Sequence, residues 1–307
     1  MNLHKTLAAI SGMTMVSRVT GLLRDTLIAR AFGASADTDA YYIAFRIPNL
    51  LRRLSAEGAF SQAFVPILAE YKAQKGLEAT RGMVDHVTTV LTWALLLITA
   101  AGMVFAPAVV YFTASGLQDH TFALTVVLTR IMFPYIVFMS LVALAGGILN
   151  TWREFKIPAF TPVLFNLASI AGSLFLAPFL ETPIYALAIA VFVGGVLQLG
   201  IQVPALTKIG MLPRISLHPL AALADPGVRR VLRQMVPAIA AVSVAQISLI
   251  INTNIASHLQ AKSVTWLTTA DRLMEFPTAL LGVALGTILL PNLSKASSEG
   301  NAEEYSA

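Results

Sequence analysis

The chain has 307 residues, of which 56% are hydrophobic and 12% are charged, and its formal net charge is +5. Soluble domains carry roughly 25% charged residues, so this composition excludes an ordinary soluble protein and indicates an integral membrane protein. The chain contains no cysteine, which excludes disulfides, thiolate metal sites and a cysteine nucleophile.

Eight segments are long and apolar enough to be membrane-spanning helices, since such a helix needs about 20 mostly apolar residues. In chain order they are Thr6 to Phe32, Asp39 to Tyr71, Val87 to Leu117, Ile131 to Trp152, Ile157 to Leu180, Thr182 to Thr207, Gln234 to Ala261 and Val264 to Ser294. The first, second and eighth contain charged residues, and the other five do not. The sequence therefore predicts an all-α polytopic membrane protein with about eight transmembrane helices.

Lysine and arginine are distributed unevenly among the connections between these spans. Only Lys262 lies after an odd-numbered span, whereas twelve basic residues lie before the first span or after even-numbered ones: Lys5, Lys72, Lys75, Arg81, Arg153, Lys156, Lys208, Arg214, Arg229, Arg230, Arg233 and Lys295. Because basic loops stay in the cytoplasm, we expect a multi-pass protein of the bacterial inner membrane with both ends of the chain cytoplasmic.

The longest connection, Lys208 to Arg233, contains Pro213, Pro219 and Pro226. It is typical of a linker. We therefore predict a first unit of six helices at residues 1–218 and the start of a second unit, with two helices, at residues 219–307.

The first predicted span carries charges that lipid does not tolerate. Arg18, Arg24 and Asp25 together cost about 7–10 kcal/mol near the centre of a bilayer on insertion scales. Arg18, Gly21 and Asp25 continue a rhythm of three and four residues that begins at Ser11 and Thr14, which places them on one face of a helix. This face therefore needs a polar partner or a water-filled cavity.

The second and eighth spans repeat this arrangement. The second carries Asp39, Tyr42, Arg46, Asn49, Arg53 and Glu57 at similar spacing, and the eighth carries Asp271, Arg272 and Glu275 on a broad face. Pro48 can kink the second span and shift its register, so spacing leaves open whether Arg52 or Arg53 points inward.

Two interpretations follow from these charges. They form ion pairs that hold helices together, or they line one cationic chamber, because six arginines face five acids. The guanidinium group of arginine binds phosphate through two hydrogen bonds and stays charged, so a chamber would suit a phosphate or pyrophosphate head group. We expect no catalytic residue, no metal site and no cofactor, because the sequence shows no metal-ligand spacing, phosphate-binding glycine loop or nucleophile–base pair.

Several long stretches resemble the MurJ lipid II flippases: "MTMVSRVTGLLRD", "TDAYYIAFRIPNLLRRLSAEGAFSQAFVPILAEY", "GGILNTWREFKIPAFTPVLFN", "QISLIINT" and "ADRLMEFPTALLGVALGTILLPNLSKA". That family belongs to the multidrug/oligosaccharidyl-lipid/polysaccharide exporter superfamily, whose fold is two six-helix lobes packed as a V. The resemblance implies transport of undecaprenyl-pyrophosphate-linked peptidoglycan precursor from the cytoplasmic to the periplasmic leaflet.

The resemblance also implies roles for individual residues. Substrate-binding arginines fall on Arg18, Arg24, Arg52 and Arg272, which favours Arg52 over Arg53 as the inward residue. Acids near the cavity and its gate fall on Asp25, Asp39 and Glu57. The spacing adds Arg46, Asn49, Arg53, Asp271 and Glu275 as further cavity or gate residues.

Members of that family have about fourteen helices, whereas this sequence predicts eight. It would supply the first lobe and the first two helices of an incomplete second lobe, and we expect it to be inactive alone, without further C-terminal helices or a partner chain. The expected partners are lipid II and the bilayer, with no nucleic acid. The alternatives are another exporter of the superfamily (a polysaccharide-lipid flippase or a drug antiporter), an intramembrane enzyme acting on polyprenyl pyrophosphate, and a non-transporting scaffold.

Overall fold

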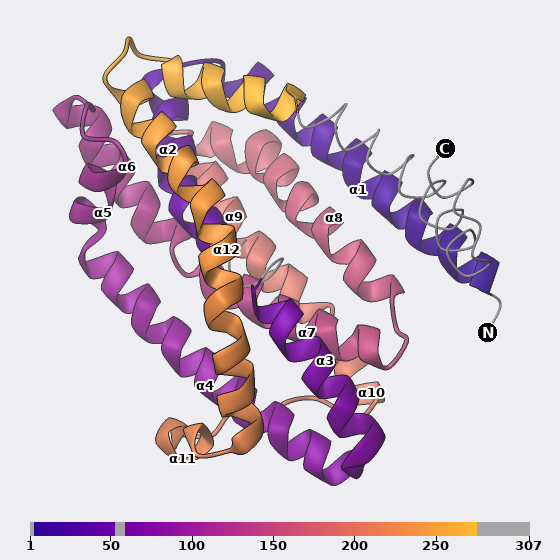
Figure 1. Cartoon of the computed structure of the whole chain (residues 1–307). Coiled ribbons are helices and arrows are strands. Elements are labelled where there is room, and N and C mark those ends of the chain that lie inside the picture. The colour runs from indigo at the N-terminus through magenta and orange to yellow at the C-terminus, as the bar shows by residue number, and fades with distance from the viewer. Residues whose placement is uncertain (1–2, 53–58, 275–307) are drawn as a thin grey trace, which may run out of the picture.

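The computed structural model describes residues 3–52 and 59–274, and every regular element in these two ranges is a helix (Figure 1). This confirms the all-α prediction. In chain order the helices are α1 (Leu3–Phe32), α2 (Ala36–Arg52), α3 (Ala59–Gln74), α4 (Gly76–Val104), α5 (Ala106–Thr113), α6 (Asp119–Met132), α7 (Tyr135–Thr151), α8 (Lys156–Ala171), a π-helical turn (Gly172–Leu176), a 3-10 turn (Ala177–Phe179), α9 (Tyr185–Gly200), α10 (Val203–Lys208), α11 (Pro219–Leu223), α12 (Pro226–Ser257) and a final helix at 263–274.

Four long helical stretches in the described residues are apolar enough to cross a membrane: Gly76–Val104, Asp119–Thr151, Lys156–Phe179 and Tyr185–Lys208. They correspond to the third to sixth predicted spans. The second of them begins at Asp119, so the predicted start at Ile131 was twelve residues too late. Arg130 lies on α6, where its Nε donates to the carbonyl of Met103 at 3.1 Å, and this single charge does not end the helix.

Two described helices, α2 and α3, cover most of the second predicted span (Figure 1). Residues 53–58 between them lie outside the described residues. α2 packs against α6 and α7, whereas α3 packs against α12 and α7. The main neighbour thus changes along this span, from α6 at α2 to α12 at α3, while α7 contacts both parts.

The seventh predicted span begins earlier than hydropathy alone suggests. The Asp225 carboxylate accepts hydrogen bonds from the backbone N–H groups of Gly227 at 2.7 Å and Val228 at 3.2 Å, and Pro226 fills the first helical position. Because an N-terminal aspartate followed by proline starts a helix, α12 begins at residue 226. Three of the arginines predicted to lie in the connection, Arg229, Arg230 and Arg233, are therefore helical. One of them, Arg230, forms an ion pair with Glu70 of α3 at 2.8 Å.

The connection before α12 lies along α4. The Asp85 carboxylate accepts a hydrogen bond from the backbone N–H of Arg214 at 2.8 Å, and the Thr89 hydroxyl accepts one from that of Ser216 at 3.1 Å. His86 Nδ1 lies 2.9 Å from Asp225 Oδ2. These contacts order the connection, and the unit boundary at residue 218 stays a prediction.

Small residues bring α8, α9 and α7 close together. A Cβ atom on Gly194 would lie 3.0 Å from the Phe165 ring, and one on Gly195 would lie 3.0 Å from the Tyr135 ring. Small residues allow close packing of helices in lipid. Here they hold Phe165 and Tyr135 in the wall of the cavity described next.

Candidate functional site

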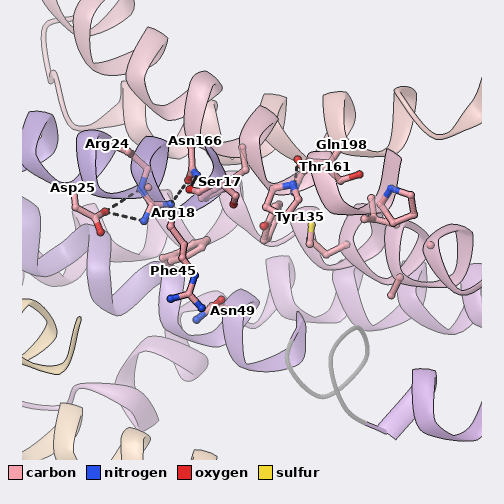
Figure 2. Close-up of a pocket in the computed structure, with 18 of the residues that line it drawn as sticks. Ser17, Arg18, Arg24, Asp25, Phe45, Asn49, Tyr135, Thr161, Asn166 and Gln198 are labelled. Carbon is pink, nitrogen blue, oxygen red and sulfur yellow. Dashed lines mark hydrogen bonds and ion pairs between the residues drawn. The ribbon is translucent and has the colours of Figure 1, made fainter. Parts of the chain in front are cut away.

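A cavity of about 930 Å³ opens between α1, α2, α3, α7, α8, the end of α9 and the helix at 263–274. Of the residues predicted to form the site, it brings together Arg18, Arg24, Asp25, Asn49 and Arg272. Figure 2 shows most of these side chains with the aromatic and amide residues that share the wall. These five residues come from the first, second and eighth predicted spans.

The polar face of α1 faces this cavity. Ser17, Gly21 and Asp25 line it at intervals of four residues, as expected for one face of a helix. On the other side Met15 and Val19 are exposed, Met15 by 61%. Between Met15 and Asp25, α1 therefore has one side toward the cavity and an exposed apolar side that suits lipid.

Asp25 is the acceptor at the centre of the charged part of the cavity. The Nε and one terminal nitrogen of Arg24 donate to its Oδ1 at 2.9 and 2.8 Å. Arg272, which is 247 residues away in the chain, donates to the same oxygen. One carboxylate oxygen thus binds two arginines and joins α1 to the helix at 263–274.

Asn166 of α8 orients Arg24. Its side-chain oxygen accepts a hydrogen bond from the other terminal nitrogen of Arg24 at 2.9 Å, and its amide nitrogen donates to the carbonyl of Ser17 at 3.0 Å and the hydroxyl of Thr20 at 3.1 Å. Figure 2 shows Asn166 beside Arg24 and Ser17. This amide therefore fixes both the guanidinium group and the position of α1 on α8.

The charged lining of the cavity is cationic. Among the described lining residues, three arginines (+3) and one aspartate (−1) give a net charge of +2. Arg18 has neither a hydrogen bond nor an ion pair in the described part of the chain. Aromatic rings lie under the other two guanidinium groups. The Cζ atom of Arg24 is 5.4 Å from the centre of the Phe165 ring, and that of Arg272 is 5.7 Å from the centre of the Tyr42 ring. An uncompensated positive charge in the wall of a cavity favours an anionic ligand.

Asp39 does not line the cavity. It is 6% exposed, and its carboxylate accepts hydrogen bonds from the backbone N–H of Lys262 at 2.6 Å, the N–H of Thr265 at 2.7 Å and the hydroxyl of Thr265 at 2.5 Å. These are the contacts of an N-terminal helix cap. Asp39 therefore attaches α2 to the start of the helix at 263–274.

The remaining predicted residues fall into two groups. Arg46 donates to the carbonyl of Leu249 at 3.0 Å and to the hydroxyl of Thr268 at 3.3 Å, and neither Arg46 nor Asp271 is among the described residues that line the cavity. The others cannot be placed: the Arg52 side chain and residues Arg53, Glu57 and Glu275 lie outside what the structure describes.

Several polar lining residues were not predicted from the sequence, namely Asn150, Thr161, Asn166, Gln198 and Gln202. Each is a polar, uncharged residue in or beside an otherwise apolar span. Such residues in a membrane helix usually face the bundle interior. That signal was available, but no periodic pattern accompanied it.

The model of the family described as lipid II flippase MurJ matches residues 28–307. The chain belongs to the lipid II flippase MurJ family. A lipid II flippase MurJ from Burkholderia cenocepacia is 63% identical over all of this chain and 60% of its own length, and a probable lipid II flippase MurJ from Haemophilus influenzae is 44% identical over 92% of this chain and 56% of its own. The chain thus spans about 60% of the length of these relatives.

Solved structures agree with the MurJ assignment. A lipid II flippase MurJ in an inward closed conformation has a TM-score of 0.78 and 28% identity, with 95% of this chain and 59% of that one covered. An inward-facing multidrug resistance MATE family transporter of the MOP superfamily has a TM-score of 0.72 at 15% identity, over 97% of this chain and 68% of that one, which shows a shared fold. The predicted resemblance and fold class are confirmed, and this MurJ family member is a multi-pass membrane protein.

Proposed function

We propose that this chain forms part of a lipid II flippase, a transporter and not an enzyme. It would move undecaprenyl-pyrophosphate-linked peptidoglycan precursor from the cytoplasmic to the periplasmic leaflet of the bacterial inner membrane by alternating access. Both ends of the chain would lie in the cytoplasm. Because the chain spans about 60% of its relatives, we expect transport to need further helices, supplied C-terminally or by a partner chain.

The observation that carries this proposal is the net charge of +2 on the cavity lining. Arginine offers planar, paired donors that match phosphate oxygens and stays charged at every physiological pH. Arg18 and Arg24 on α1 and Arg272 on the adjoining helix at 263–274 would hold the two phosphates, with Arg52 as a fourth donor. The polyprenyl tail would stay in lipid beside the exposed apolar face of α1.

Asp25 would couple binding to movement. A pyrophosphate that takes the donors of Arg272 competes with Asp25 for the same nitrogen atoms. Release of Arg272 would loosen the contact between α1 and the helix at 263–274. We propose that Asp39, Arg46 and the other acids and bases predicted from the sequence shape the gate around this contact: Asn49, Arg53, Glu57, Asp271 and Glu275.

Binding of undecaprenyl pyrophosphate to the purified chain in nanodiscs tests the proposal. Arg18→Gln and Arg24→Gln should each weaken binding about 10- to 100-fold, because a charge-assisted hydrogen bond contributes about 1.5–3 kcal/mol. Arg214→Gln is the control, since Arg214 is exposed and lies outside the cavity lining. Equal affinity of all four proteins would overturn the pyrophosphate site.

Transport requires a second assay. The chain alone, and the chain joined to the remaining C-terminal part of the Burkholderia cenocepacia relative, are expressed in cells depleted of their own flippase. Only the joined protein should prevent lipid II from accumulating in the cytoplasmic leaflet, and Arg24→Gln should abolish this effect. Persistent lipid II accumulation with a correctly inserted protein would favour another exporter of the superfamily.

A further inference from the structure

The cavity has a second, uncharged end formed by Asn150, Thr161, Gln198 and Gln202, which we call the amide end. Every charged residue of the described lining comes from α1 or the helix at 263–274, whereas the amide end comes from α7, α8 and the region of α9 and α10. Figure 2 shows Thr161 and Gln198 apart from Arg24 and Asp25, with Tyr135 between the two groups. One cavity therefore offers two different chemistries.

The hydrogen bonds at the amide end leave two acceptors unused. Gln198 donates through Nε2 to the Thr161 carbonyl at 3.3 Å, and Gln202 donates through Nε2 to the Thr161 hydroxyl at 3.3 Å. The Oε1 atoms of both glutamines have no partner in the described part of the chain, although the residues are only 3% and 1% exposed. Buried acceptors without partners are rare in folded proteins and call for an explanation.

Exchanging the oxygen and nitrogen atoms of these amides does not remove the problem. The Thr161 carbonyl can only accept, so Gln198 must present its nitrogen. The Thr161 hydroxyl already donates its hydrogen to the Ile157 carbonyl at 2.8 Å, so it too can only accept from Gln202. Both glutamine oxygens are therefore unsatisfied for a geometric reason.

Both glutamines line the cavity, so a ligand that brings donors could satisfy the acceptors that the protein leaves unused. We propose that the amide end binds the carbohydrate part of the head group, with Gln198 and Gln202 accepting hydrogen bonds from sugar hydroxyl or acetamido N–H groups. This inference rests on the proposed function, in which the arginines hold the pyrophosphate. The sugar is bonded directly to that pyrophosphate, so it is the first donor-rich group beyond the cationic end.

The geometry allows the exchange. The terminal torsion of glutamine is broad and soft, so each amide can turn its oxygen toward the cavity while giving up one long bond to Thr161. An uncharged wall suits a neutral sugar, whereas a wall with further arginines would not. Gln198 and Gln202 thus determine specificity by favouring glycosylated carriers over bare polyprenyl pyrophosphate.

The test compares two lipids on the purified chain in nanodiscs: undecaprenyl pyrophosphate, and undecaprenyl pyrophosphate carrying the disaccharide without peptide. The wild-type chain should bind the second about tenfold or more tightly. Gln198→Met and Gln202→Met should each lower affinity for the disaccharide lipid about three- to tenfold, the size of one or two neutral hydrogen bonds, and leave affinity for the bare lipid unchanged. Thr92→Val is the matched control, because Thr92 also carries a buried unpartnered oxygen but does not line the cavity.

The outcomes separate the two proposals. Equal weakening of both lipids by the glutamine variants, or equal affinity of the wild-type chain for the two lipids, overturns the sugar site. If Arg24→Gln then weakens binding of both lipids, the pyrophosphate site is still supported. Binding of neither lipid by the wild-type chain overturns both. Each methionine variant loses one long bond to Thr161 together with an unsatisfied oxygen, so its melting temperature should stay close to that of the wild-type chain. A clearly lowered melting temperature would show that the glutamines are structural.

Discussion

Replacement of Asp39 by alanine should destabilise the start of the helix at 263–274, although Asp39 itself lies on α2. The Asp39 carboxylate accepts from two backbone N–H groups and one hydroxyl of the Lys262–Thr265 turn. Loss of an N-terminal cap costs about 1 kcal/mol, and the Thr265 N–H, which is buried, adds about 1–3 kcal/mol when it loses its acceptor. We expect a total of about 2–4 kcal/mol.

Hydrogen–deuterium exchange of the amides at 263–274 measures this loss directly. Since 1.4 kcal/mol corresponds to tenfold in an equilibrium constant, protection in Asp39→Ala should fall about a hundredfold. Asp39→Asn keeps one acceptor oxygen and remains a good cap, so protection should fall only about tenfold. Asp37→Ala is the control, because Asp37 lies in the same first turn of α2 but is not hydrogen-bonded to any described residue.

Protection in Asp39→Ala within threefold of the wild-type chain would refute the reasoning. It would show that the carboxylate does not hold the start of this helix. A fall of equal size in Asp37→Ala would also refute it, since the effect would then come from removing negative charge near the helix N-terminus and not from the three hydrogen bonds.

Two further predictions concern packing and charge. Gly102→Ala should lower the unfolding free energy by about 1–3 kcal/mol, because a Cβ atom there would lie 2.0 Å from the buried Phe133 ring. On the same helix, a Cβ atom at Gly82 meets nothing within 4 Å, so Gly82→Ala should stabilise the protein by about 0.4–1 kcal/mol. Thermal unfolding in detergent compares the two variants, and equal effects would contradict the packing between α4 and Phe133. In nanodiscs, Asp25→Asn should bind undecaprenyl pyrophosphate more tightly than the wild-type chain, because it removes the anion that competes for two arginines. The same variant should melt at a lower temperature. Weaker binding at unchanged stability would argue against this competition.

The part of the site on α1 could be predicted because one physical pattern determines it. α1 is a single helix without an internal proline, so its period of 3.6 residues is uninterrupted from Arg18 to Asp25. The cost of charge in lipid then requires that this face be the inner one. Helix type and the polar face of α1 therefore followed from the sequence.

On α2 the same spacing predicted which face of the helix is polar, but not which part of the protein that face contacts. Tyr42 and Asn49 line the cavity, whereas Asp39 and Arg46, on the same stripe, contact the turn at Lys262, the helix at 263–274 and α12. Periodicity records which side of a helix is polar. Whether that side meets a cavity or a neighbouring helix depends on packing between segments some 200 residues apart, which no local pattern contains.

The amides were missed for a related reason. Asn166 and Gln198 are isolated polar residues in apolar spans, and a single such residue is equally compatible with a bond between helices or with a ligand. In the structure Asn166 joins α8 to α1, and Gln198 joins α9 to α8 through its Nε2 while its oxygen has no partner in the described part of the chain. Only the full set of hydrogen bonds separates the two cases.

The size of the interaction at Asp25 limits what it can do in a transport cycle. Moving an equilibrium between two states from 1:99 to 99:1 requires about 5.5 kcal/mol of differential binding, and one charge-assisted hydrogen bond such as that between Arg272 and Asp25 supplies about 1.5–3 kcal/mol. In the proposed cycle, exchange at Asp25 would therefore bias the equilibrium without completing the switch. The bonds from Arg46 to Leu249 and Thr268 join the neighbouring helix α2 to the helices that follow residue 226, and together with the cap at Asp39 they supply contacts of the required size. Opening of the cavity should thus need these contacts to change together with the ion pair at Asp25.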